Sequence, residues 1–215
     1  IIDILLGGDN AVVIALACRK LPPAQRTKGI IFGTAGAIIL RVILIAFAMT
    51  LLNIPFLKFV GAVLLVWIGV KLLAPDEDGH GDVQGSDRLF AAIKTIIVAD
   101  LVMSVDNVIA IAGAAQNAGE HSLLLVVLGL LISIPIIVWG SQLVLRLMDR
   151  FPIIITAGGM LLGWIAGTMA VTDPAVVSMI PQDDTVKYAA GLAGAVLVYV
   201  IGKMVAARKA AQPAG

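Results

Sequence analysis

The sequence has little charge and a single cysteine. Charged residues make up 13% of its 215 positions, whereas a soluble domain carries roughly 25%. Hydrophobic residues make up 60%, and the mean hydropathy is +1.05. The apolar residues form blocks that are long enough to cross a hydrocarbon core of about 30 Å. This composition excludes an ordinary soluble domain and predicts an all-α, polytopic membrane protein.

The scarcity of cysteine, basic runs and histidine excludes further classes of function. Cys18 has no second cysteine with which to form a disulfide within the chain. The net charge is +1 and no basic run is present, so we expect no binding to nucleic acid. The two histidines, His80 and His121, fall in polar loops, so the apolar segments contain no imidazole. We expect no enzymatic activity.

The apolar blocks predict seven transmembrane helices. They cover approximately residues 1–18, 29–52, 56–74, 89–115, 123–147, 153–171 and 186–207. The chain starts with Ile1 rather than methionine and shows no signal peptide, so we expect the first helix to begin upstream.

The first six spans form a repeat with an offset of 97 residues: Pro55 aligns with Pro152, and Trp67 with Trp164. Three spans per unit is an odd number, so the second unit must cross the membrane in the opposite direction, as in many transporters with inverted repeats. The expected organisation is a first repeat at 1–74, a cytoplasmic loop at 75–88 and an inverted repeat at 89–171. Residues 172–215 add a loop, a seventh helix and a basic tail.

The basic residues indicate one orientation. They gather after the first span, after the fifth span and in the tail, as Arg19, Lys20, Arg26, Lys28, Arg146, Arg150, Lys203, Arg208 and Lys209. In a protein with seven spans these three places share one side, which the positive-inside rule makes cytoplasmic. We therefore expect the N-terminus outside and the C-terminus in the cytoplasm.

One acidic motif occurs at the start of each repeat. Its copies are Asp3, Asp9 and Asn10, and Asp100, Asp106 and Asn107. Ionised carboxylates are costly in apolar surroundings, which favours a functional role over helix caps or interfacial positions. Carboxylate and amide oxygens suit Mg²⁺, Ca²⁺ or Mn²⁺ and argue against Zn²⁺ or Cu⁺. The two copies predict one all-oxygen cation site.

The helical period constrains how the motif is used. Residues seven apart differ by about 20° around a helix, so Asp3 and Asn10 share a face while Asp9 lies off it. We expect Gly7 and Gly8 to let the helix unwind and turn Asp9 inward. Other glycines, including Gly33 and Gly163, are expected at helix contacts.

Arg41 lies near the middle of the second span, where an uncompensated charge is costly. We expect it to pair with one of the carboxylates when the metal is absent, either as a gate or as a purely structural ion pair. Its equivalent in the second repeat is Val138. Neighbouring carboxylates repel one another, so protons and metal would compete for the site, which is the basis of antiport.

These features together resemble the TerC family of integral membrane proteins, in particular its small seven-span bacterial branch. The resemblance rests on the doubled Asp-x5-Asp-Asn motif, on Ile38-Ile39-Leu40-Arg41 and on the Pro-Gly-Trp pattern of the third and sixth spans. The family is named for tellurium resistance, is grouped with the LysE-type exporters and has members implicated in manganese export. The resemblance therefore implies manganese efflux, with Asp9, Asn10, Asp106 and Asn107 as the core of the metal site.

The sequence thus predicts a multi-pass protein of the bacterial inner membrane that exports Mn²⁺ from the cytoplasm. The expected partners are this ion and the lipid bilayer, with self-association into a homo-oligomer left open and no cofactor beyond the transported ion. One alternative is the export of Ca²⁺ or another ion on the same fold. The other is a membrane scaffold in metal or tellurite stress resistance, in which the Asp–Arg cluster only holds helices together.

Overall fold

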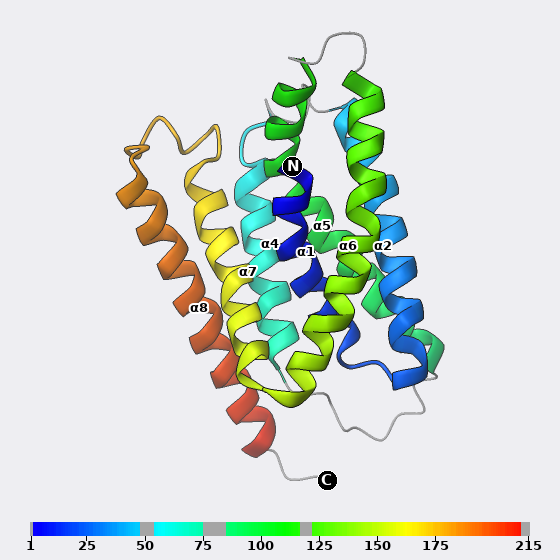
Figure 1. Cartoon of the computed structure of the whole chain (residues 1–215). Coiled ribbons are helices and arrows are strands. Elements are labelled where there is room, and N and C mark those ends of the chain that lie inside the picture. The colour runs from blue at the N-terminus through cyan, green and yellow to red at the C-terminus, as the bar shows by residue number, and fades with distance from the viewer. Residues whose placement is uncertain (1, 48–53, 75–84, 117–121, 212–215) are drawn as a thin grey trace. The chain divides into compact units, whose positions relative to one another are not determined.

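The computed structural model describes residues 2–47, 54–74, 85–116 and 122–211 (Figure 1). For residues 2–7, 45–46, 85, 106–116, 122–128, 130–131 and 209–211 only the backbone is described. The described part contains seven helices, α1 (Ile2–Cys18), α2 (Pro23–Ala46), α4 (Leu57–Leu73), α5 (Gly85–Gln116), α6 (Ser122–Arg150), α7 (Ile153–Val171) and α8 (Asp184–Ala211).

Four of the described helical segments are long and apolar enough to cross a membrane, at residues 23–44, 132–150, 153–171 and 184–208. The expected all-α membrane protein is therefore confirmed. The helix bounds also follow the apolar blocks closely, and α7 covers the same residues as the sixth predicted span. Most of the loop predicted at 75–88 lies outside the described residues.

The bounds of α2 differ most from the prediction, since this helix covers Pro23–Ala46 rather than about 29–52. Proline is favoured in the first turn of a helix, where its missing N–H removes no hydrogen bond. The added turns carry Arg26 and Lys28, because a helix can continue into the polar region beyond the hydrocarbon.

The chain divides into two compact units. Unit 1, residues 1–54 and 83–150, contains α1, α2, α5 and α6, and unit 2, residues 55–82 and 151–215, contains α4, α7 and α8. In unit 1, α2 packs on α5, and α1 packs on α5 and α6. In unit 2, α7 packs on both α4 and α8 (Figure 1). Each unit thus takes helices from both parts of the predicted repeat.

Glycines allow the closest of these helix contacts. A Cβ atom at Gly33 of α2 would lie 2.5 Å from Ile96 Cδ1 of α5. In unit 2, a Cβ atom at Gly163 of α7 would overlap the carbonyl of Gly194 on α8. The predicted role of these glycines at helix contacts is therefore confirmed, and it matches the close packing that small residues permit between membrane helices.

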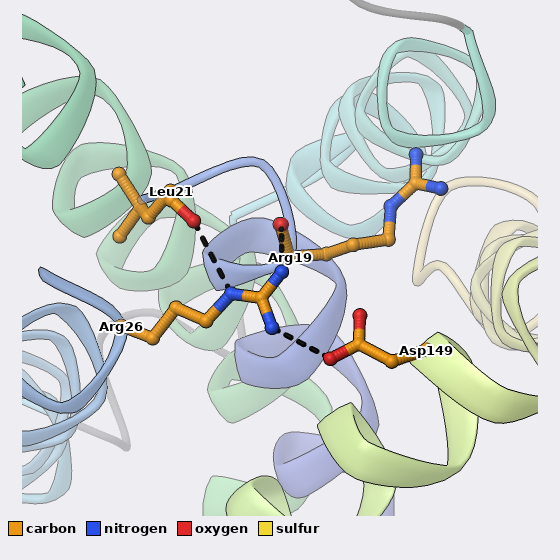
Figure 2. Close-up of polar contacts among 4 residues, drawn as sticks. All are labelled: Arg19, Leu21, Arg26 and Asp149. Atoms are coloured by element: carbon orange, nitrogen blue, oxygen red, sulfur yellow. Dashed lines mark hydrogen bonds and ion pairs between the residues drawn. The ribbon is translucent and has the colours of Figure 1, made fainter. Parts of the chain in front are cut away.

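Arg26 joins three helices at one end of unit 1 (Figure 2). Its Nη2 donates to the carbonyl of Arg19 at 3.1 Å, and its Nε donates to the carbonyl of Leu21 at 3.2 Å. Its Nη1 forms an ion pair with Asp149 Oδ2 of α6 at 2.6 Å. Carbonyls at the end of a helix have no partner within it, so Arg26 supplies donors where α1 turns into α2.

Asp173 joins the α7–α8 loop to the N-terminus of α4 in unit 2. Its buried carboxylate accepts hydrogen bonds from the backbone N–H groups of Phe56 at 3.0 Å, Phe59 at 3.1 Å and Ala175 at 2.8 Å. Burial acts to raise the pKa of Asp173, but the N–H groups of Ala175, Phe59, Phe56 and Lys58 outweigh it and hold the pKa below the ordinary 3.8. The carboxylate thus caps α4, where Phe56 has a left-handed φ of 63°.

Candidate functional site

A buried ion pair connects α2 and α5 inside unit 1. Arg41 Nη2 of α2 lies 2.6 Å from Asp100 Oδ1 of α5. Arg41 is 2% exposed and Asp100 is 7% exposed, so both charges are withdrawn from solvent. The pairing that the sequence led us to expect between Arg41 and one of the motif carboxylates is therefore present, and it compensates two charges that would each be costly alone.

Ser104 extends this ion pair into a closed network. Its hydroxyl accepts a hydrogen bond from Arg41 Nε at 3.2 Å and donates one to Asp100 Oδ2 at 3.2 Å. Ser104 is fully buried. Ser104 is not among the site residues predicted from the sequence, although its position four residues after Asp100 places both side chains on one helix face. That spacing is the signal that would have found it.

Asn10 of α1 approaches the same carboxylate from another side. It lines a cavity with Val13 and Ile14 of α1, and α5 supplies Ile96, Asp100 and Met103. The volume open to the centre of a water molecule is about 10 Å³, which is roughly the space for one water.

Asn10 itself is 4% exposed, and its Nδ2 has no hydrogen-bond partner among the described residues. A buried amide without a partner is costly. The unpartnered Nδ2 therefore marks a place where a hydrogen-bond acceptor, such as a water or another oxygen atom, would be stabilised.

The positions that line this cavity follow from helical spacing. Residues 10, 13 and 14 of α1 recur at intervals of three and four, as do residues 96, 100 and 103 of α5. Such intervals place side chains on one face of a helix. Each copy of the motif therefore places a polar side chain, Asn10 or Asp100, on the face where α1 and α5 pack on each other.

The structure corrects the expectation for Gly7 and Gly8. Helix α1 is regular from Ile2 to Cys18 and passes through both glycines without unwinding. An unwound turn within an apolar bundle would leave backbone N–H and C=O groups without partners, and the regular helix avoids this cost. Asp9 consequently stays off the face that carries Asn10, and its side chain is half-buried.

The remaining motif residues lie outside the described side chains: Asp3, Asp106 and Asn107. Of the four motif carboxylates, only Asp9 and Asp100 are described. Among the side chains that the structure does describe, no group of three or more His, Cys, Asp or Glu could hold a metal ion. The convergence of all four carboxylates therefore stays a prediction.

Chemically, Arg41, Asp100 and Ser104 form a network without net charge. The charges of Arg41 and Asp100 cancel, and the adjacent cavity has room for about one water. A cation would need oxygen ligands that are free of the guanidinium. The Asp100 carboxylate therefore becomes available to a cation only when Arg41 moves away from it.

These observations define a polytopic helical membrane protein with an ionisable network buried among its helices. The chain belongs to the TerC family of integral membrane proteins, because the sequence profile of this family matches residues 1–210. It is similar to membrane protein YjbE of Bacillus subtilis, with 46% identity over 186 residues that cover 86% of this chain and 83% of that protein.

More distant relatives occur in the same and in another bacterium. Membrane protein YceF of Bacillus subtilis is 27% identical over 79% of this chain and 68% of its own length. Inner membrane protein YgdQ of Escherichia coli is 25% identical over 71% of this chain and 69% of its own length. No solved structure matches the chain.

Proposed function

We propose that this protein is a secondary transporter that exports Mn²⁺ from the cytoplasm through the acidic site between α1 and α5. The observation that carries the proposal is the convergence of Asn10 and Asp100 on one buried cavity. They come from the two copies of the acidic motif. A buried ionisable residue inside a membrane protein is most simply a functional one.

The predicted repeat fits this location. In inverted-repeat transporters the substrate binds where equivalent helices of the two repeats meet, and α1 and α5 carry the equivalent motifs and pack on each other. We therefore keep seven spans, an inverted repeat, an outside N-terminus and a cytoplasmic C-terminus as parts of the proposal. The bacterial inner membrane is the proposed location, as for the relative YgdQ, which is named an inner membrane protein.

Arg41 already pairs with one carboxylate of the motif. Its guanidinium neutralises Asp100, so the charge of this carboxylate is compensated within the protein itself. Mn²⁺ would compete with Arg41 and with protons for the carboxylates. We propose that Asp9, Asn10, Asp106 and Asn107 bind the ion, with Asp3 and Asp100 contributing charge. Exchange of Mn²⁺ for protons then follows from the competition.

Transport into proteoliposomes tests this proposal directly. The purified chain is reconstituted, and Mn²⁺ entry is followed by quenching of a trapped dye, with and without an imposed pH gradient. Asp9→Asn and Asp106→Asn should abolish the signal, whereas Asp3→Asn and Asp100→Asn should weaken it. Wild-type rates in both of the first two variants would disprove the site. A rate that does not respond to the pH gradient would disprove proton exchange.

The ion itself is tested by competition. Excess Ca²⁺ or Mg²⁺ outside the vesicles should reduce Mn²⁺ entry only weakly if the site prefers Mn²⁺. Complete inhibition by equimolar Ca²⁺ would instead favour the export of Ca²⁺ on the same fold.

One observation favours a second candidate, a membrane scaffold with no transport activity. Asp100 and Ser104 satisfy the polar groups of Arg41 that face them, as expected of an ion pair that only holds α2 against α5. In that case, replacing Arg41 and Asp100 together by leucine would leave the biological activity intact. If the protein is a transporter, the same double variant should fold and transport Mn²⁺ more slowly than the wild type.

A further inference from the structure

Unit 2 contains a second cavity, at the end where α4 and α8 finish and α7 begins. Its volume is about 100 Å³, which is enough for a phosphate-sized group. It is lined by Leu73, Pro152, Ile155, Thr156, Tyr199, Gly202, Lys203 and Ala206. The transport site proposed above contains none of these residues.

The spacing of the lining residues shows how the cavity forms. On α8 they recur at positions 199, 202, 203 and 206, and on α7 at 155 and 156, with Pro152 directly before α7, so each helix contributes one face. Gly202 brings the backbone of α8 close to α4, since a Cβ atom there would lie 2.8 Å from Leu73 Cδ1. The cavity therefore belongs to the regular packing of the three helices.

The polar groups of the cavity suit an anion. Lys203 contributes an ammonium group and Thr156 a hydroxyl group to the lining. The Lys203 Nζ lies 5.9 Å from the centre of the Tyr199 ring, which positions the charge at the wall. Among the described side chains no carboxylate pairs with Lys203, which is exposed. The first turn of α7 has no side-chain cap and adds a partial positive charge.

The charges around the cavity have one sign. At this end of unit 2 the described charged residues are Lys71, Lys203 and Arg208, whereas the described acidic residues of the unit, Asp173, Asp183 and Asp184, lie at the opposite end of α7 and α8. Next to the lining residues Tyr199 and Lys203, Val200 is 45% exposed and Met204 is 50% exposed. An anionic group held here would thus have apolar surface beside it.

We propose that this cavity binds the phosphate headgroup of an anionic phospholipid, with Lys203 and Thr156 as the contacting residues and an acyl chain along the exposed face of α8. Basic pockets between helices at a membrane surface bind such headgroups. The site goes beyond the transport function and depends on neither its substrate nor its direction.

The test uses the full chain in nanodiscs of phosphatidylcholine, with or without phosphatidylglycerol. Bound lipid is counted by native mass spectrometry after release, and the unfolding temperature is measured in parallel. The wild type should retain phosphatidylglycerol in preference to phosphatidylcholine. Lys203→Gln should lower this retention by roughly fivefold or more, the effect of losing one cation at a membrane surface. Thr156→Val should lower it less, and Lys203→Arg should restore it.

Lys71→Gln is the matched control, because it removes one exposed lysine from the same end of the same unit but outside the cavity. It should retain phosphatidylglycerol far better than Lys203→Gln does. Equal losses in the two variants would show diffuse surface attraction and overturn the proposal. Equal retention of both lipids by the wild type would also overturn it. Displacement of the lipid by millimolar inorganic phosphate would assign the cavity to a soluble phosphate instead.

Discussion

At the scale of single residues, the network of Arg41, Asp100 and Ser104 explains how two charges persist in an apolar bundle. The guanidinium and the carboxylate are 2.6 Å apart, and the Ser104 hydroxyl contacts both. The stabilisation is asymmetric. An intact pair adds little compared with apolar side chains of similar size, whereas removal of one partner leaves a buried charge without compensation.

This asymmetry leads to the first prediction. Arg41→Leu and Asp100→Leu should each lower the free energy of unfolding by about 3 to 5 kcal/mol, the usual cost of breaking a buried pair. The double variant should recover most of the loss, because neither charge remains. Ser104→Ala should cost less, about 1 to 2 kcal/mol, since it removes a neutral hydroxyl. Unfolding in detergent by circular dichroism gives these values, and additive losses in the double variant would contradict the coupling.

The second prediction concerns Gly8 within the regular helix α1. Gly8 is exposed, and no described atom lies within 4 Å of a Cβ built there. Glycine in a helix interior costs about 0.5 to 1 kcal/mol relative to alanine. Gly8→Ala should therefore raise stability by about this amount and leave Mn²⁺ transport at the wild-type rate.

Gly29→Ala is the control for this measurement, because its Cβ would lie 2.7 Å from Leu21 Cδ1 and 2.9 Å from Cys18 Sγ. It should destabilise the protein and show that the assay detects a clash. Loss of transport in a stable Gly8→Ala variant would mean that the helix must open at the glycines during the cycle.

At the scale of elements, the apolar blocks were sufficient to predict each described helix. The ends of the helices were harder to predict, because they depend on local groups such as Pro23, which starts α2 outside the apolar block.

The contacts within the site could be predicted only in part. The cost of a lone charge predicted a carboxylate partner for Arg41, but the choice of Asp100 and the approach of Asn10 depend on how α1, α2 and α5 pack. The Gly7–Gly8 prediction was wrong because helix propensity yields to the need for paired backbone groups.

The third prediction concerns the cap on α4. Asp173→Ala should lower the free energy of unfolding by about 1 to 2 kcal/mol, the usual cost of removing a side chain that caps the N–H groups at the start of a helix. The pKa of Asp173 is lower in the folded than in the unfolded state. Its contribution is therefore complete above the ordinary pKa of 3.8 and declines as the pH falls through the lower, folded value.

The measurement is thermal unfolding of the wild type and Asp173→Asn as the pH is lowered from neutral. The stability difference between them should shrink only in the acid range below the ordinary carboxylate pKa. Asp183→Asn serves as the control, since this carboxylate accepts its bond from Val186 N at an exposed position. A difference between the wild type and Asp173→Asn that stays constant into strong acid would show that the charge of Asp173 does not stabilise α4.

At the scale of the whole molecule, the buried polar side chains differ between the two units. Those described in unit 1 lie within the helices and include Asn10, Thr34, Arg41, Asp100 and Ser104. In unit 2 the buried charged residues among the described side chains are Lys58 and Asp173, and both lie at a helix end. Polar chemistry at membrane depth is thus concentrated in unit 1, which is where we propose transport, while α4, α7 and α8 form a mainly apolar packing unit.

The fourth prediction concerns the orientation of the chain. The proposed topology places the α7–α8 loop outside and the start of α2 and the end of α8 in the cytoplasm. Cys18 is buried and can be replaced by serine, which leaves a background without cysteine. Single cysteines are then introduced as Ser178→Cys, Ala24→Cys and Ala207→Cys, all at exposed positions.

In intact cells, a maleimide that cannot cross the membrane should label the variant at position 178 and neither of the others. After permeabilisation all three should react, which controls for accessibility. Positions 24 and 207 are separated by most of the chain, so their identical behaviour requires an even number of crossings between them. Labelling of one but not the other in intact cells would contradict the span count, and labelling of both but not of position 178 would reverse the direction. A reversed direction would place Arg26 and its partners outside and contradict the assignment of the basic ends to the cytoplasm.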